Sequence, residues 1–162
     1  MLSKAIQKAL NEQLNAELYS SYLYLSMSAY FEAANLPGFA HWMRVQAREE
    51  EGHGMKFYEH IVDRLGRVKL QAVECPPAEW DSPLAAFEAA LEHERLVTGR
   101  IDDLVKLACK EADNAAAAFL QWFVTEQVEE EAQADKVVRQ LERIGDAAAP
   151  LLMLDAVMAK RE

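Results

Sequence analysis

Four glutamates stand at positions where the helical pattern calls for apolar residues, one in each of four long periodic stretches. When the apolar face of each stretch is read at every seventh residue, one carboxylate appears among the apolar residues. The four are Glu17, Glu50, Glu94 and Glu130. A single such glutamate is typical of a boundary residue that reaches water. Four buried, unpaired carboxylates would each cost several kcal/mol, and no lysine or arginine stands on these stripes. We therefore interpret the four as ligands for cations.

A histidine and a glutamine extend this set. His53 follows Glu50 by three residues and so shares its side of the helix, and Gln127 precedes Glu130 by three. Two divalent cations would balance four carboxylates, and this donor set suits Fe, Mn or Zn better than Ca or Mg. The spacing predicts two unequal ion positions that share one carboxylate. The richer position comprises Glu17, Glu50 and His53, and the poorer one comprises Glu50, Glu94 and Glu130.

More carboxylates than two ions require flank this proposed centre. Runs such as EEE are usually a solvated face of a helix, and we interpret Glu51 and Glu131 in that way. The others lie beside the centre on both motif-bearing helices and indicate a third cation position: Glu49, Glu126 and Glu129.

Two glycines lie within the same helical stretch as the histidine. Each glycine destabilises a helix by roughly 1 kcal/mol relative to alanine, so the presence of Gly52 and Gly54 requires an explanation. They either allow a neighbouring backbone to approach or soften the helix locally, and the sequence leaves both open.

The elements that must position these residues are all helices. Ser82-Pro83 and Asp113-Asn114 are typical helix starts, while Gly66 and Gly145 are typical stops. The segment between Gly66 and the third helix is too long for a turn and predicts an extended crossover. These features predict an all-α, ferritin-like four-helix bundle with one long crossover and a short fifth helix. We expect one domain, residues 1–162, with helices near 4–34, 37–65, 83–110, 114–144 and 147–159.

Composition narrows the function. The formal charge of −10 argues against nucleic-acid or anionic-membrane partners, which require a basic face, and makes metal cations more natural partners. The first ten residues have no apolar signal core and no stretch is long enough to span a membrane, so we expect a cytoplasmic location. Cys75 and Cys109 stand far apart and outside any CxxC pair, which favours two free thiols.

Four stretches resemble the bacterial non-haem ferritins, and the resemblance covers essentially the whole chain. They are NEQLNAELYSSYLYLSMSAYF (11–31), AREEEGHGMKF (47–57), HERL (93–96) and FLQWFVTEQVEEE (119–131). The resemblance implies a hollow octahedral cage of twenty-four identical subunits. Such a cage would oxidise Fe(II) with dioxygen or peroxide at a di-iron centre within each subunit and store the ferric mineral inside.

The resemblance also assigns roles to single residues. It implies that Glu50 bridges two irons, that Gln127 lies beside the second, and that a third iron binds at Glu49, Glu126 and Glu129. Tyr24 matches the tyrosine next to the centre, and Trp122 matches a nearby aromatic credited with supplying electrons. For both aromatics, packing in the core is the alternative.

Related classes differ at identifiable positions. Bacterioferritins have a haem-ligating methionine just before the metal-site histidine, where this chain has Gly52, so the sequence argues against haem. A small-molecule di-metal oxidase or peroxidase that forms dimers, and a structural subunit with a vestigial site, remain alternatives to the iron-storage ferroxidase. Glu111 and Asp113 either line a pore or are simply solvated.

Overall fold

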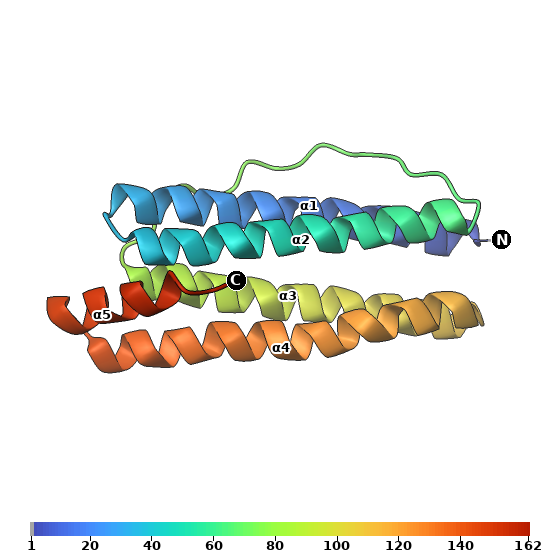
Figure 1. The fold of residues 1–162 in the computed structure, drawn as a ribbon. Coiled ribbons are helices and arrows are strands. Elements are labelled where there is room, and N and C mark those ends of the chain that lie inside the picture. Colours follow the sequence, from blue (N-terminus) through green and yellow to red (C-terminus); the bar gives the residue numbers. More distant parts are fainter. Residues whose placement is uncertain (1) are drawn as a thin grey trace.

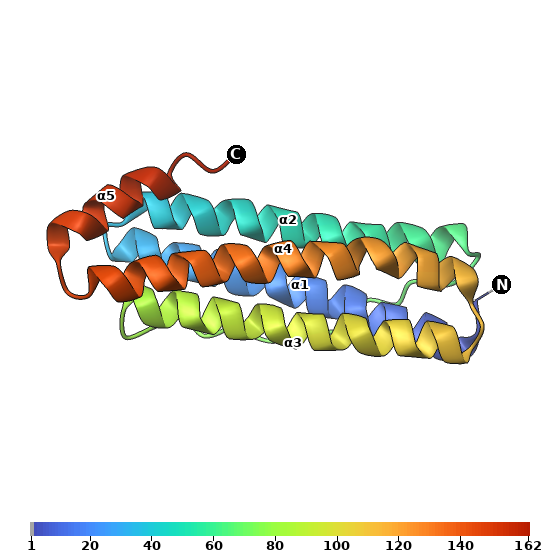
Figure 2. The same cartoon turned by 90° about the horizontal axis from the view of Figure 1, so that it is seen from below.

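The computed structural model describes residues 2–162, which form five helices and no strand. Four long helices lie side by side as a bundle and the short fifth packs across one end (Figures 1 and 2). This confirms the predicted all-α bundle with a fifth helix. No helix in the described part of the chain has the length and apolar character needed to cross a membrane. The helices are α1 (Lys4–Ala33), α2 (Pro37–Asp63), α3 (Pro83–Lys110), α4 (Asn114–Ile144) and α5 (Ala148–Met158).

Side-chain caps begin α3 and α4 where the sequence predicts them. The Ser82 hydroxyl accepts a hydrogen bond from the amide of Ala85 at 3.0 Å, and Pro83 occupies the first turn. The Asp113 carboxylate accepts one from the amide of Ala116, also at 3.0 Å. Asp113 additionally receives two hydrogen bonds from Arg64, at 3.1 and 3.0 Å. Its carboxylate therefore caps a helix and ties the end of α2 to the start of α4.

The end of α2 differs slightly from the prediction. The helix stops at Asp63, two residues early, and the left-handed residue is Leu65 (φ 58°) instead of a glycine. The Gly66 amide then donates to the Ile61 carbonyl at 2.8 Å. A Cβ at Gly66 would lie 2.9 Å from that same oxygen. Glycine is thus required here for a close approach of the backbone.

The crossover between α2 and α3 travels the length of the bundle along α1, as predicted (Figure 1). Asn11 holds its first part, because its side chain accepts from the Lys69 amide at 2.6 Å and donates to the Arg67 carbonyl at 3.1 Å. The Ser26 hydroxyl donates to the Pro77 carbonyl farther along. Cys75 on this segment and Cys109 on α3 are exposed and free in the described chain.

The apolar core is divided into two clusters along the bundle axis. One cluster contains Phe31, Phe39 and Phe87, and the other contains Phe57 and Phe123. On each of the four long helices, residues of one cluster are followed by a short buried polar segment and then by residues of the other cluster. The inward-facing glutamates all belong to this polar layer, which is therefore enclosed by apolar packing on both sides.

The fifth helix docks on the start of α2 through a close backbone contact. A Cβ built on Gly38 would lie only 1.7 Å from the carbonyl oxygen of Asp155. The Asp155 carboxylate accepts a hydrogen bond from the Phe39 amide at 2.9 Å. It therefore satisfies a free N–H group at the beginning of α2, where the N-cap Leu36 provides no side-chain oxygen.

Candidate metal centre

All four inward glutamates are buried in the polar layer, at no more than 4% exposure. Each comes from a different helix, so the layer gathers four carboxylates at one level of the bundle. His53 is 5% exposed and joins them from α2, one turn after Glu50. The structure therefore brings together the glutamates and the histidine that the sequence singled out.

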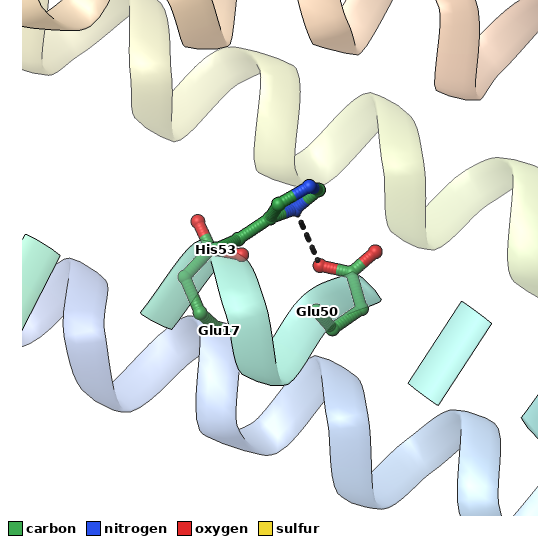
Figure 3. A group of neighbouring side chains, drawn as sticks. All are labelled: Glu17, Glu50 and His53. Carbon is green, nitrogen blue, oxygen red and sulfur yellow. Dashed lines mark ion pairs between the residues drawn. The ribbon is translucent and has the colours of Figure 1, made fainter. Parts of the chain in front are cut away.

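Three overlapping groups have ligand atoms within 4.8 Å of one another. In the first group, Glu17 of α1 turns toward Glu50 and His53 of α2, as Figure 3 shows. Glu50 also belongs to the second group, so its carboxylate can serve an ion in either position. The groups are Glu17–Glu50–His53, Glu50–Glu94–Glu130 and His53–Glu126–Glu130.

Uncharged side chains orient the carboxylates. Gln13 Nε2 donates a hydrogen bond to Glu17 Oε1 at 2.7 Å. Gln46 Nε2 donates to Glu50 Oε1 and to Glu130 Oε2, at 2.8 Å each. Glu94 accepts two hydrogen bonds, from Gln127 Nε2 to its Oε2 at 3.1 Å and from the Tyr24 hydroxyl to its Oε1. Within residues 2–162, Glu17 Oε2 is buried and receives no hydrogen bond. A buried acceptor without a donor is unfavourable, and a metal ion would satisfy it.

Burial and mutual repulsion favour protonated carboxyls in the absence of metal. Burial, followed by the charge of Glu50, raises the pKa of Glu17 well above its usual range and that of Glu94 to about 7. The same two causes raise the pKa of Glu130 to about 8. Burial opposes ionisation of Glu50 too, but bonds from His53 and Gln46 outweigh it and lower its pKa. Glu50 is thus the carboxylate that stays charged.

His53 lies between the inner carboxylates and the outer end of the site. Its Nδ1 atom is 3.3 Å from Glu50 Oε2, and its Nε2 atom is 3.8 Å from Glu126 Oε1. Burial tends to lower the pKa of His53, but the bond to Glu50 and the surrounding carboxylates raise it overall. The ring of Trp122 contacts His53 edge-on, with centroids 5.3 Å apart.

The three residues predicted to hold a third ion are arranged differently from one another. Glu126 joins His53 and Glu130 in the third ligand group. Glu49 pairs with Arg161, whose Nη2 atom lies 2.5 Å from Glu49 Oε2. Glu129 is exposed and accepts a hydrogen bond from Gln133 at 3.0 Å.

Sequence reasoning missed three residues around the centre. Gln13 precedes Glu17 by four positions and Gln46 precedes Glu50 by four, and this spacing, which lets a glutamine amide reach a carboxylate on the same helix face, was a usable signal. Arg161 gave no such signal, because it reaches Gln46 from 115 positions away.

A four-helix bundle with one long crossover and an interior layer of carboxylate and imidazole donors is typical of the class of helical proteins that bind metal through carboxylates. The family profile of the ferritin-like domain matches residues 7–144. The chain therefore belongs to the ferritin family.

Its relatives are similar over their whole lengths. A bacterial non-haem ferritin of Bacteroides fragilis is 45% identical, over 99% of this chain and 100% of the relative. One from Staphylococcus saprophyticus is 40% identical, over 99% and 96%.

Two solved structures superpose almost completely. An open pore ferritin from the hyperthermophilic archaeon Archaeoglobus fulgidus has a TM-score of 0.99 and 54% identity, covering 100% of both chains. A closed form of that ferritin, engineered by site-directed mutagenesis, has a TM-score of 0.99 and 55% identity over 100% and 99%.

Proposed function

We propose that the buried carboxylate layer is where this ferritin oxidises iron. The chain is an iron-storage ferroxidase of the ferritin family, and the layer offers the donors that its substrate requires. The observation that carries this assignment is the set of four buried glutamates and one histidine, with no lysine or arginine among their hydrogen-bond partners in the described chain. Divalent iron would supply the missing positive charge.

Two Fe(II) ions bind side by side and share Glu50. Glu17 and His53 complete the first position, and Glu94 and Glu130 complete the second. Gln127 and Tyr24 orient Glu94, so we assign them supporting roles at the second position. Each iron gives up one electron; dioxygen accepts two electrons and two protons to become peroxide, or peroxide accepts them to become two waters.

A third ion belongs to the same proposal. It would use Glu49, Glu126 and Glu129, next to the first two ions. Because Arg161 bonds to Oε2 of Glu49, this ion must compete with the guanidinium for the carboxylate. We therefore expect it to bind more weakly than the other two.

We infer that the chain assembles with copies of itself into a cage of twenty-four, working in the cytoplasm. The fifth helix supports assembly, because Leu152, Met153 and Val157 on it are exposed apolar residues. Twenty-four chains of 18.3 kDa would elute near about 440 kDa, far from a dimer. Since the Archaeoglobus relatives include an open pore and a closed form, electron microscopy of the particles would report which arrangement this chain adopts.

Aerobic addition of Fe(II) to metal-free protein tests the proposed function. The near-ultraviolet ferric absorption is followed by stopped flow, first at two Fe per chain and then at several hundred per assembled particle. We expect rapid oxidation, with the iron soluble and in the high-mass fraction. Substituting His53→Ala or Glu130→Ala should slow the first phase about 100-fold without loss of assembly. Glu51→Ala, an exposed neighbour in the same run, is the matched control.

Each alternative predicts a different result. Oxidation that stops after two ions per chain, or iron that precipitates outside the protein, would indicate a di-metal oxidase without storage. A particle that assembles but never oxidises iron would indicate a structural subunit. Unchanged kinetics in both His53→Ala and Glu130→Ala would place the chemistry elsewhere.

A further inference from the structure

Arg161, beyond the end of α5, reaches back to the metal-site region of α2. Its Nη2 atom donates to Gln46 Oε1 at 2.7 Å and to Glu49 Oε2 at 2.5 Å. The guanidinium also lies over the ring of Trp42, with its carbon 4.1 Å from the ring centroid. Only 13% of the Arg161 side chain is exposed. These contacts hold the guanidinium in one place, in contrast to an ordinary surface arginine.

The arginine determines which end of the Gln46 amide faces the carboxylates. A guanidinium has only donors, so it selects the carbonyl oxygen Oε1 and directs the NH₂ group the other way. That group donates to Glu50 Oε1 and to Glu130 Oε2, at 2.8 Å each. With the amide reversed, its oxygen would face two carboxyl groups and lose both bonds.

Gln46 in turn fixes the orientation of two carboxyl groups at the proposed iron positions. It occupies Glu50 Oε1, so the other oxygen, Oε2, points toward His53 at 3.3 Å, where the first ion would bind. It occupies Glu130 Oε2 in the same way on the second position. A single amide therefore holds the shared carboxylate and one ligand of the second ion together.

We propose that Arg161 is a positioning residue for the metal centre and acts through Gln46. It would not touch iron. Its guanidinium sets the orientation of the amide, and the amide sets the orientations of Glu50 and Glu130. The kinetic part of this inference rests on the proposed ferroxidase function, whereas the metal-affinity part does not.

Metal affinity is measured with Co(II), whose visible absorption reports its coordination and which does not need an oxidation step. Arg161→Met keeps an unbranched, flexible side chain, although a shorter one, and removes every donor and the charge. We expect Co(II) binding at the centre to weaken about tenfold, with an altered visible spectrum, as for other groups that orient metal ligands. Initial Fe(II) oxidation should slow by a similar factor. Lys160→Met, the same loss of charge at the exposed neighbour, is the control.

A double-mutant cycle distinguishes positioning from general stabilisation. If Arg161 acts through Gln46, then Arg161→Met should change Co(II) affinity by less than twofold in a Gln46→Met background. Arg161→Lys should restore part of the affinity, because an ammonium also donates but cannot reproduce the planar guanidinium. Size-exclusion chromatography and thermal melting of each variant verify that the particle is intact.

The possible results distinguish the role of Arg161 from the proposed ferroxidase function. Wild-type Co(II) affinity and spectrum in Arg161→Met would overturn the inference, and so would effects that multiply fully in the double variant or an equal loss in Lys160→Met. If the wild-type protein failed to oxidise Fe(II), that result would contradict the proposed function. The Co(II) measurements would still decide the role of Arg161.

Discussion

The Nδ1 atom of His53 lies 3.3 Å from Oε2 of Glu50, one helical turn earlier on α2, and this pair belongs to the ligand group where we propose that the first ion binds. In the metal-free protein the imidazole and the carboxylate satisfy each other. Burial opposes the charged imidazole, but the bond to Glu50 raises the pKa of His53 overall. An ion that binds here must therefore separate the pair and compete with a proton for the imidazole.

Metal binding should release protons in a pH-dependent way. Burial and the charge of Glu50 raise the pKa of Glu94 to about 7 and of Glu130 to about 8, so both are protonated in acidic solution and ionised above these values. Titration calorimetry with Zn(II), in buffers of different ionisation enthalpy, should show about two protons or more released per chain at pH 6 and few above about pH 9. Apparent affinity should rise over the same interval. A release that stayed constant from pH 6 to 9 would contradict the assigned ligands.

The metal-free protein should become less stable as pH rises from about 4.5 to about 8. A carboxyl whose pKa is raised by folding binds more protons in the folded than in the unfolded state across this window, so the free energy of unfolding falls with pH, by up to about 1.4 kcal/mol per unit for each group. Glu94 and Glu130 both contribute in this direction. Thermal melting in a chelating buffer measures the effect.

Glu130→Gln provides the control for that pH dependence. The variant should melt a few degrees higher than wild type at pH 8.5, because it removes a buried charge, and nearly equally at pH 5, where Glu130 is already neutral. It should also lose metal affinity. A variant that is less stable at pH 8.5 would show that Glu130 is stabilised as an anion.

Gly38→Ala should displace α5. The added methyl carbon would lie 1.7 Å from the Asp155 carbonyl oxygen, so the two helices must separate and the hydrogen bond that the Phe39 amide donates to the Asp155 carboxylate should break. We expect a loss of about 2 kcal/mol or more of stability, together with impairment of the proposed assembly. Size-exclusion chromatography and thermal melting provide the measurements. A fully assembled variant with wild-type melting would contradict the close docking of α5.

Gly52→Ala, the same substitution in the same helix, should have the opposite effect. A Cβ at Gly52 meets no atom within 4 Å, so alanine should stabilise α2 by roughly 0.5–1 kcal/mol through its helix propensity. Iron oxidation should be unchanged if Gly52 makes no contact that the metal centre requires. A lower melting temperature would show that the glycine meets a contact made in the assembled particle.

The sequence left two reasons open for the two glycines of α2, approach of a neighbouring backbone or local softening of the helix, and the structure bears on the first. Nothing approaches Gly52, and the three atoms nearest to a Cβ at Gly54 belong to the side chains of Leu14, Glu17 and Leu18. No neighbouring backbone is therefore the nearest contact of either residue.

The helices and the four inward-facing glutamates could be predicted from local features of the chain. Each apolar stripe and its one glutamate are local features, because a period of 3.6 residues fixes which side chains share a face. One carboxylate on the inward face of each of four helices leaves a single place for them to meet. The caps at Ser82 and Asp113 follow from the same local chemistry.

The atoms that meet between helices could not be predicted from the sequence. Periodicity assigns a face to Gln46, but not the Glu130 oxygen on α4 that it bonds, nor the arginine 115 positions away that orients it. Pairing of Glu49 with Arg161 depends likewise on how α5 docks. Such contacts depend on the relative translation and rotation of separate helices, which are set by packing over the whole bundle and leave no periodic signal in the chain.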